Sequence, residues 1–397
     1  MNRNNYDDWN FMGKSLTGNV SEGKSSINFK RNSVVLFTVI LILVVLGLVC
    51  TFSATYPQAL TEGRNHYYYL QNQIIYIFSG LVIGLLFYFV PEKSFEVLSP
   101  LSVFIFFGLA IASELGALFS SEFTYSLLVL GISMYLSHYF GKRNNSFDRL
   151  REIALPLLFC VAFFFVVTLE KNLMMSLLFL VLIIYLFALG GVGLGGVLLL
   201  ILFIGVPFVC TVLSDPNEIK EILGFFIPGL FTGNDATQSV LRYKSISSGN
   251  IMGKGAAQGL YKYGVIDGIA GPYILCNIFE EFGFFGFGVV SFLFILIIIL
   301  GYSGARGLRN INCFYSNLCN SMTTLIVWQF ILNTASVFEV LPFSFLSMPF
   351  FSYGMDVAVV IIECFLLLKT FKKEKEKAEL PVYQKYDYSQ EPALYEK

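Results

Sequence analysis

The sequence predicts an all-α, polytopic integral membrane protein with about ten transmembrane helices. Apolar residues make up 56% of its 397 residues and charged residues only 13%, whereas a soluble domain carries roughly 25% charged residues. The mean hydropathy is +0.69. Apolar runs near the length of a bilayer crossing recur from residue 34 to residue 368. Helices of about 20 such residues satisfy their own backbone hydrogen bonds in lipid.

The apolar runs divide the chain into three regions. Residues 1–33 are polar and rich in Asn, Ser and Lys, which predicts a disordered cytoplasmic tail. Residues 34–369 form the membrane domain, and residues 370–397 form a cytoplasmic tail rich in Lys and Glu. The ten spans are expected near residues 34–53, 71–90, 99–119, 123–140, 154–169, 173–189, 193–213, 273–303, 318–338 and 346–368.

The distribution of charge predicts the orientation of these spans. If the N-terminus lies in the cytoplasm, the loops that follow the even-numbered spans carry most of the loop Lys and Arg, and the C-terminal tail is also basic. This positive-inside bias favours an N-in/C-in arrangement and hence an even number of spans. Residues 214–273, the longest polar interval between spans, then form a large extracytoplasmic loop between spans seven and eight.

Four basic residues of this loop lie on the outer side, against the positive-inside bias. They are Arg242, Lys244, Lys254 and Lys262. Cations at this position are candidates for binding an anionic headgroup such as a pyrophosphate. The alternative is that each is a solvated loop charge. Both histidines of the chain lie outside the loop, which excludes a histidine metal site there.

Two adjacent acids, Glu280 and Glu281, lie about two helical turns inside the eighth span. Carboxylates at that depth are unfavourable, so they normally pair with a cation or line a wet cavity. We expect pairing with a loop cation, either Lys254 or Arg242. Direct contact with a substrate is the alternative.

Four short segments stand in an order and at spacings that are found together in one family of membrane proteins. They are Ser248-Gly249 with Gly253-Lys254-Gly255, similar to G-G-x-x-G-K-G; Glu280–Gly283, similar to E-E-L-G; Gln329 and Asn333, at Q-x-x-x-N spacing; and Pro349–Gly354, similar to P-F-I-S-Y-G. The chain therefore resembles the SEDS family, the FtsW-, RodA- and SpoVE-like proteins that polymerise lipid II into peptidoglycan.

The resemblance implies the SEDS fold and a place in the bacterial cytoplasmic (inner) membrane. It implies lipid II, or a glycan linked to undecaprenyl pyrophosphate, as substrate. It also implies a class B penicillin-binding protein, other divisome or elongasome membrane proteins and membrane lipids as partners, and no nucleic acid. It leaves open a divalent cation, for which no ligand is identified, and a role in division or in elongation. The residues expected to bind substrate are Arg242, Lys244, Lys254, Glu280, Glu281, Gln329, Asn333 and Ser352.

The chain departs from the family pattern where the family performs catalysis. The position of the family's catalytic aspartate, eight residues before Glu280, is Pro272. A proline side chain cannot act as a base or hold a metal. Asp267, five residues upstream, is the nearby acid that can substitute. The family's G-G-S-S element also differs, since Asp356 stands at its first serine.

Two functions are compatible with these residues. In the first, the protein is an active peptidoglycan glycosyltransferase that uses Asp267 as its base. In the second, it is a non-catalytic SEDS scaffold or regulator that binds lipid II and a class B penicillin-binding protein.

The predicted topology is testable by cysteine labelling. In a variant whose native cysteines are replaced, single cysteines at Thr237 and Lys375 should react with a membrane-impermeant maleimide from opposite sides of the membrane. The reason is that Thr237 lies in the large loop and Lys375 in the C-terminal tail. Labelling of both positions from the same side would contradict the ten-span arrangement.

Overall fold

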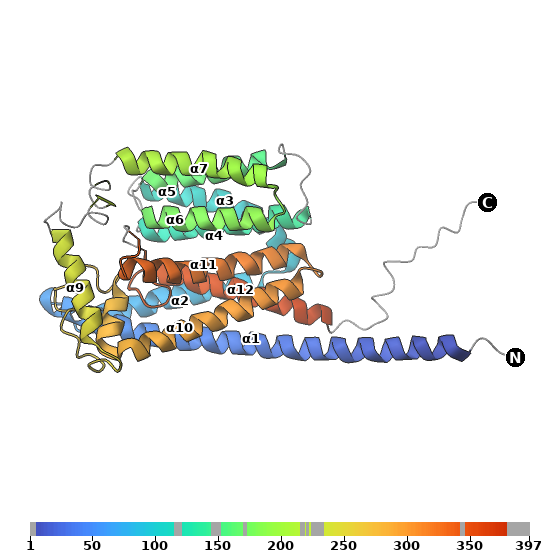
Figure 1. Ribbon diagram of the computed structural model, residues 1–397, viewed down its shortest axis with the longest axis horizontal. Coiled ribbons are helices and arrows are strands. Elements are labelled where there is room, and N and C mark those ends of the chain that lie inside the picture. The colour runs from blue at the N-terminus through green and yellow to red at the C-terminus, as the bar shows by residue number, and fades with distance from the viewer. Residues whose placement is uncertain are drawn as a thin grey trace.

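The computed structural model describes residues 5–114, 121–143, 152–169, 173–214, 219, 222–223, 234–341 and 346–378. Within these ranges the regular secondary structure consists of eleven helices. Ten of them run side by side in a bundle, and α9 (Asn234–Ser248) lies at one end of it (Figure 1). The bundle helices are α1 (Asn5–Thr61), α2 (Tyr68–Phe89), α3 (Glu92–Glu114), α4 (Ser121–Lys142), α5 (Ala154–Leu169), α6 (Leu173–Leu189), α7 (Leu194–Ser214), α10 (Ile274–Leu308), α11 (Cys313–Val337) and α12 (Asp356–Ala378).

Each of the ten predicted spans overlaps one helix of the bundle, and residues 115–119 of the third predicted span lie outside the described residues. Within the described residues, four stretches are long and apolar enough to cross a membrane: Asn32–Thr61, Tyr68–Phe89, Lys93–Ala112 and Ile274–Leu308. Three shorter apolar helices accompany them: Ala154–Val167, Met174–Leu189 and Gly195–Cys210. The prediction of an all-helical protein with several candidate membrane spans is therefore confirmed.

Helices α4, α11 and α12 form the interior of the bundle, where their polar side chains find partners. The hydroxyl of Ser137 on α4 lies 3.1 Å from that of Ser321 on α11. The hydroxyl of Ser99 on α3 donates to the carbonyl of Met134 on α4 at 2.7 Å. The outer helices α2, α3 and α7 instead expose many large apolar side chains. This is the distribution expected in hydrocarbon, which offers polar groups no partner.

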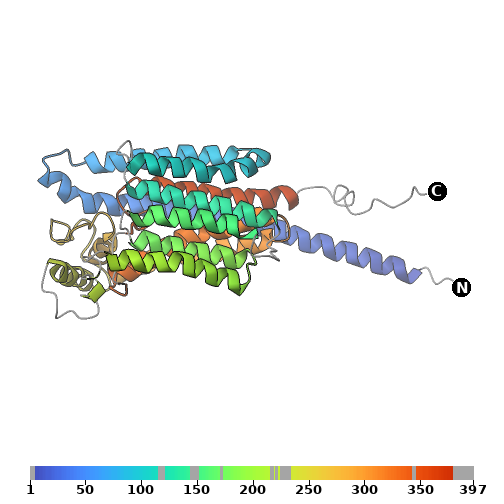
Figure 2. The same ribbon diagram turned by 90° about the horizontal axis from the view of Figure 1, so that it is seen from above.

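The first and last helices have other boundaries than predicted. Helix α1 begins at Asn5 and extends beyond the rest of the bundle (Figures 1 and 2), whereas the disorder expected for residues 1–33 stays a prediction. Extending an existing helix requires no new nucleation. Helix α12 begins at Asp356 rather than near residue 346, because Phe350 and Gly354 have φ angles of 69° and 154°, which no right-handed helix contains. It continues to Ala378, and the rest of the predicted C-terminal tail lies outside the described residues.

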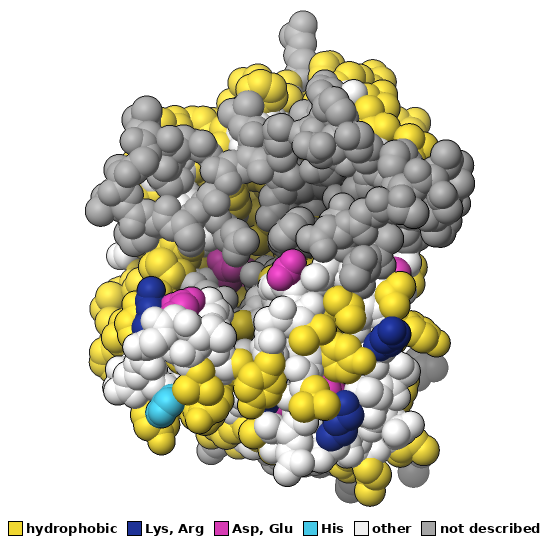
Figure 3. Space-filling model, turned by 90° about the vertical axis from the view of Figure 1, so that its left-hand side faces the viewer, with side chains coloured by type: hydrophobic (Ala, Val, Ile, Leu, Met, Phe, Trp, Pro, Cys, Tyr) yellow, Lys and Arg dark blue, Asp and Glu magenta, His cyan; other side chains and the backbone are white. Residues whose placement is uncertain are grey.

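The large loop predicted between spans seven and eight connects α7 to α10. Its described part consists mainly of α9 and the turns of residues 249–273, which gather at one end of the bundle (Figure 2). Figure 3 views this end, where apolar side chains, Lys and Arg, and a few acids are interspersed. The described part of the loop therefore caps the ends of the helices rather than extending away from them.

Candidate functional site

Helix α10 is interrupted at Gly283, whose φ of 66° and ψ of −167° are not helical. An interruption leaves backbone groups without partners inside the helix, which is unfavourable where water is scarce. Residues 250–255 of the loop supply those partners. The hydrogen bonds are Lys254 N to Glu280 O (2.9 Å), Gly255 N to Glu281 O (2.9 Å), Phe284 N to Asn250 O (3.1 Å) and Phe285 N to Ile251 O (2.9 Å).

Two glycines of the loop permit this close approach. A Cβ atom on Gly249 would lie 1.8 Å from the carbonyl oxygen of Phe279. A Cβ atom on Gly253 would lie 2.2 Å from the carbonyl oxygen of Glu281, and Gly253 also has a φ of 77°, which favours glycine. The sequence motifs around Gly253 and Gly283 thus belong to one packing unit, in which the loop is pressed against the interruption of α10.

Glu280 is held by three donors of the loop. Its Oε1 atom accepts from Lys254 Nζ at 2.7 Å and from Leu260 N at 2.8 Å, and its Oε2 atom accepts from Tyr261 N at 3.1 Å. The carboxylate is fully buried, whereas the Lys254 side chain is 30% exposed. The predicted pairing of this acid with Lys254 is confirmed. Part of the Lys254 side chain remains accessible from the loop surface.

Glu281 has a different partner from those predicted. Lys262 Nζ lies 2.6 Å from Glu281 Oε1, and both side chains are almost completely buried. Ser53 of α1 completes the cluster, because its hydroxyl lies 2.5 Å from Glu281 Oε1 and 2.8 Å from Lys262 Nζ. Lys262 was expected on the outer side as a headgroup candidate. No regular sequence spacing indicates that Lys262 pairs with Glu281, 19 residues later, and with Ser53 on α1.

Arg242 does not pair with either acid of α10. Its guanidinium lies 3.2 Å from Glu339 Oε1, 2.8 Å from the hydroxyl of Ser239 and 4.5 Å from the ring centroid of Tyr273. It therefore joins α9 to the beginning of α10 and the end of α11. Lys244, on the same helix, is exposed.

Three successive backbone carbonyls hold the segment that carries Pro272. Each accepts a hydrogen bond from a different residue of α11 or of the segment before α12. The bonds are Tyr353 N to Ala270 O (2.7 Å), Ser352 Oγ to Gly271 O (2.9 Å) and Asn333 Nδ2 to Pro272 O (2.7 Å). The predicted substrate-binding residues Asn333 and Ser352 therefore lie beside Pro272, where their side chains bind main chain.

Asp267 lies at the start of the same turn. Its side chain is exposed, and its N–H donates to Gln238 Oε1 on α9 at 3.2 Å. The carbonyl contacts that position residues 270–272 do not include Asp267. The structure thus brings Asn333 and Ser352 together at Pro272 and leaves the candidate substitute acid on the loop surface.

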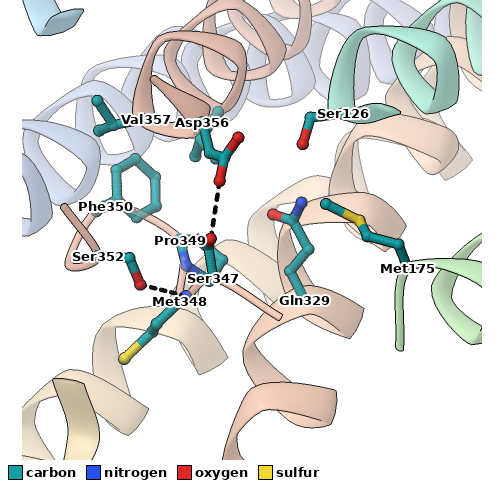
Figure 4. A pocket seen from close by; sticks show the side chains of 11 residues that line it. Ser126, Met175, Gln329, Ser347, Met348, Pro349, Phe350, Ser352, Asp356 and Val357 are labelled. Atoms are coloured by element: carbon teal, nitrogen blue, oxygen red, sulfur yellow. Dashed lines mark hydrogen bonds between the residues drawn. The ribbon is translucent and has the colours of Figure 1, made fainter. Parts of the chain in front are cut away.

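Two cavities accompany these residues. Gln329, the remaining predicted substrate-binding residue, lines a cavity of about 10 Å³ between α4, α6, α11 and the segment leading into α12 (Figure 4). A larger groove of about 760 Å³ lies at the loop end, lined by α9, residues 250–252, Phe284 and residues 337–339. Its volume is typical of sites for small ligands.

The chain matches the family model described as cell cycle protein, which unites FtsW, RodA and SpoVE, over residues 33–377. It therefore belongs to this family, the SEDS family of peptidoglycan glycosyltransferases and multi-pass membrane proteins. A probable peptidoglycan glycosyltransferase FtsW of Wigglesworthia glossinidia brevipalpis is 21% identical over 350 residues, which are 84% of this chain and 91% of the relative. A protein of the same name from Bacillus subtilis is 30% identical over 158 residues, 38% of this chain and 39% of the relative.

Solved structures support the fold. The rod shape determining protein RodA of Thermus thermophilus superposes with a TM-score of 0.59 at 16% identity, covering 85% of this chain and 95% of RodA. A chain from a study of polymerization and crosslinking by a peptidoglycan synthase complex superposes with a TM-score of 0.66 at 17% identity, covering 85% of this chain and 97% of that one. The fold of this protein is therefore RodA-like.

The buried ion pair predicts a large effect on stability. Glu281→Gln should lower the free energy of unfolding by about 3–5 kcal/mol, because Lys262 would remain buried without a counter-charge. Denaturation of the purified protein in detergent measures this change.

A matched control is Glu339→Gln, which breaks the pair with Arg242. The Glu339 side chain is 43% exposed, so this variant should lose no more than about 1 kcal/mol. The double variant Glu281→Leu/Lys262→Met, which removes both buried charges, should recover most of the stability. If Glu281→Gln is as stable as the parent, the ion pair does not support the fold.

Proposed function

We propose that this protein acts in peptidoglycan synthesis by binding lipid II and a class B penicillin-binding protein, without polymerising glycan itself. Its family and its relatives, named as probable peptidoglycan glycosyltransferases, support this pathway. The fold that it shares with a chain of a peptidoglycan synthase complex supports a role within an assembly. We place it in the bacterial cytoplasmic membrane with ten spans, both termini inside and the large loop outside.

The loop end of the bundle supports binding of a lipid-linked pyrophosphate. Such a ligand combines a long apolar chain with an anionic headgroup. The groove is lined by apolar side chains such as Ile251, Met252 and Phe284, which suit the chain. Lys244 is exposed and Lys254 is partly exposed, so both are available to the headgroup. Lys262 is not, because it is buried against Glu281.

Binding of lipid II should depend on the exposed cation of α9. Lys244→Gln should weaken binding of fluorescently labelled lipid II to the purified protein several-fold, because the charge on the pyrophosphate would lose a nearby cation. Arg309→Gln is the matched control. It removes an exposed cation at the opposite end of α10 and should leave the affinity unchanged. Equal affinities of Lys244→Gln and the parent would remove this residue from the site.

The proposal that this protein does not polymerise glycan rests on the placement of Pro272. Its backbone is fixed beside Asn333 and Ser352, and the side chain offers no proton acceptor. Glu280 and Glu281 do not replace the acid, because each is buried in an ion pair with a loop lysine.

The second candidate function is polymerisation with Asp267 as base, which the exposure of this acid in the same turn favours. In that reaction the C4 hydroxyl of the incoming lipid II attacks the anomeric carbon of the growing glycan. The bond from that carbon to undecaprenyl pyrophosphate breaks, and the carboxylate takes the hydroxyl proton. The base must lie within hydrogen-bond reach of that hydroxyl, directly or through one water.

A gel assay of glycan product separates the two functions. The purified parent protein, with and without its penicillin-binding protein, should yield no polymer from lipid II. If Asp267 were the base, the parent would yield polymer and Asp267→Ala would lose about 10²–10⁴-fold of the rate.

Pro272→Asp alone should not restore activity, because Ala270 and Gly271 also differ from the His and Thr that precede the family's acid. An active glycan polymerase serves as the positive control for the assay. Polymer from the parent that persists in Asp267→Ala would contradict both versions and require another base.

A further inference from the structure

A cluster of buried oxygen atoms surrounds the small cavity inside the bundle. Asp356 at the start of α12, Gln329 on α11 and Ser126 on α4 line it, and they are 8%, 6% and 4% exposed. Figure 4 shows the Asp356 carboxylate and the Gln329 amide directed toward the space between α4, α11 and α12. The cluster lies apart from the loop residues that bind α10, and the proposed function does not use Asp356.

Three of these oxygens lack partners. Among the described residues, none forms a hydrogen bond with Asp356 Oδ1, Gln329 Oε1 or Ser126 Oγ. The other carboxylate oxygen of Asp356 accepts from the hydroxyl of Ser347 at 2.8 Å. A buried acceptor without a donor is unfavourable, and several around one cavity indicate an occupant that interacts with all of them.

The charge of Asp356 indicates what kind of occupant is required. Within the described part of the chain, Asp356 forms no salt bridge with a Lys or Arg. An ionised carboxylate buried without a counter-charge is strongly unfavourable. Asp356 is also in the first turn of α12, where the helix dipole favours the ionised form. A positive ion beside Oδ1 therefore compensates the charge and the missing hydrogen bonds together.

We infer that Asp356, Gln329 and Ser126 form a binding site for one small monovalent cation, with Na⁺ as the ion that fits. Carboxylate, amide carbonyl and hydroxyl oxygens are the ligands that hard cations prefer. The one carboxylate that lines the cavity, among the described residues, balances a single positive charge. The volume of about 10 Å³ admits one particle no larger than a water molecule.

The site joins three helices that are far apart in sequence. A bound cation would link α4, α11 and the beginning of α12. It would lie close to Ser352, which also lines the cavity and whose hydroxyl donates to the carbonyl of Gly271. By the resemblance described above, Asp356, which supplies the charge, stands at the first serine of the G-G-S-S element. The cation would stabilise the packing beneath the segment that carries Pro272.

Thermal unfolding of the full-length protein in detergent tests this inference. Choline chloride is replaced stepwise by NaCl at constant ionic strength. The unfolding midpoint of the parent should rise and saturate, by about 2–4 °C at a tenfold excess over the half-saturating concentration. Asp356→Asn, which keeps the size and removes the charge, should show the same midpoint in both salts.

Glu363→Gln is the matched control, because Glu363 is a second buried carboxyl group on α12 that does not line this cavity. It should keep the Na⁺ response of the parent. A parent midpoint that is equal in both salts would overturn the inference, and so would an Asp356→Asn protein that responds as the parent does. A parent without Na⁺ response and a more stable Asp356→Asn would identify a protonated carboxyl group beside a trapped water instead.

Equilibrium dialysis with radioactive Na⁺ keeps the inference testable if Asp356→Asn fails to fold. The parent should bind about one Na⁺ per chain, and Gln329→Met, which removes one oxygen ligand, should bind it several-fold more weakly. Absence of bound Na⁺ on the parent, or equal affinities of the two proteins, would contradict the site.

Discussion

The interruption of α10 at Gly283 sets the constraint on which the loop end of the molecule depends. Backbone groups released there must be satisfied by protein, because hydrocarbon supplies no partners. Residues 250–255 satisfy them through main-chain hydrogen bonds, and this docking is possible only because Gly249 and Gly253 lack side chains. The same docking carries Lys254 to Glu280. The ion pair and the glycine-rich turn are therefore two parts of one arrangement.

In this arrangement some charged side chains are buried in an ion pair, whereas others are exposed and can contact a ligand. Lys262 and Glu281 neutralise each other in the interior, with Ser53 holding them to α1. Since both are buried, they stabilise the position of the loop over the bundle and cannot contact a headgroup without breaking the pair. Lys244 and part of Lys254 remain on the surface. Charge type alone does not distinguish these roles, whereas burial does.

The sequence predicts the helices far better than it predicts contacts between them. Hydropathy locates all ten bundle helices, since each contains an apolar run that polar or glycine-rich residues separate from its neighbours. Hydropathy misses α9, whose residues are polar on average. It also predicts the start of α12 ten residues too early, because residues 346–355 are mostly apolar although the φ angles of Phe350 and Gly354 are not helical. Depth and charge predict that Glu280 pairs with a loop cation, and the structure shows that this cation is Lys254 rather than Arg242. The pairing of Lys262 with Glu281 is not predictable from the sequence, because it depends on how the turn after Gly259 places Lys262 beside α10.

The segment around Pro272 is positioned by hydrogen bonds to its main chain rather than to the side chain at position 272. The bonds from Asn333, Ser352 and Tyr353 reach backbone carbonyls, which every residue type possesses. A proline at this position keeps the carbonyl acceptor of the network and lacks only an N–H. The glycines and the buried ion pairs that fix the loop lie elsewhere. The hydrogen bonds that position this segment therefore do not depend on which side chain stands at position 272, so the fold is compatible with a change of side chain there.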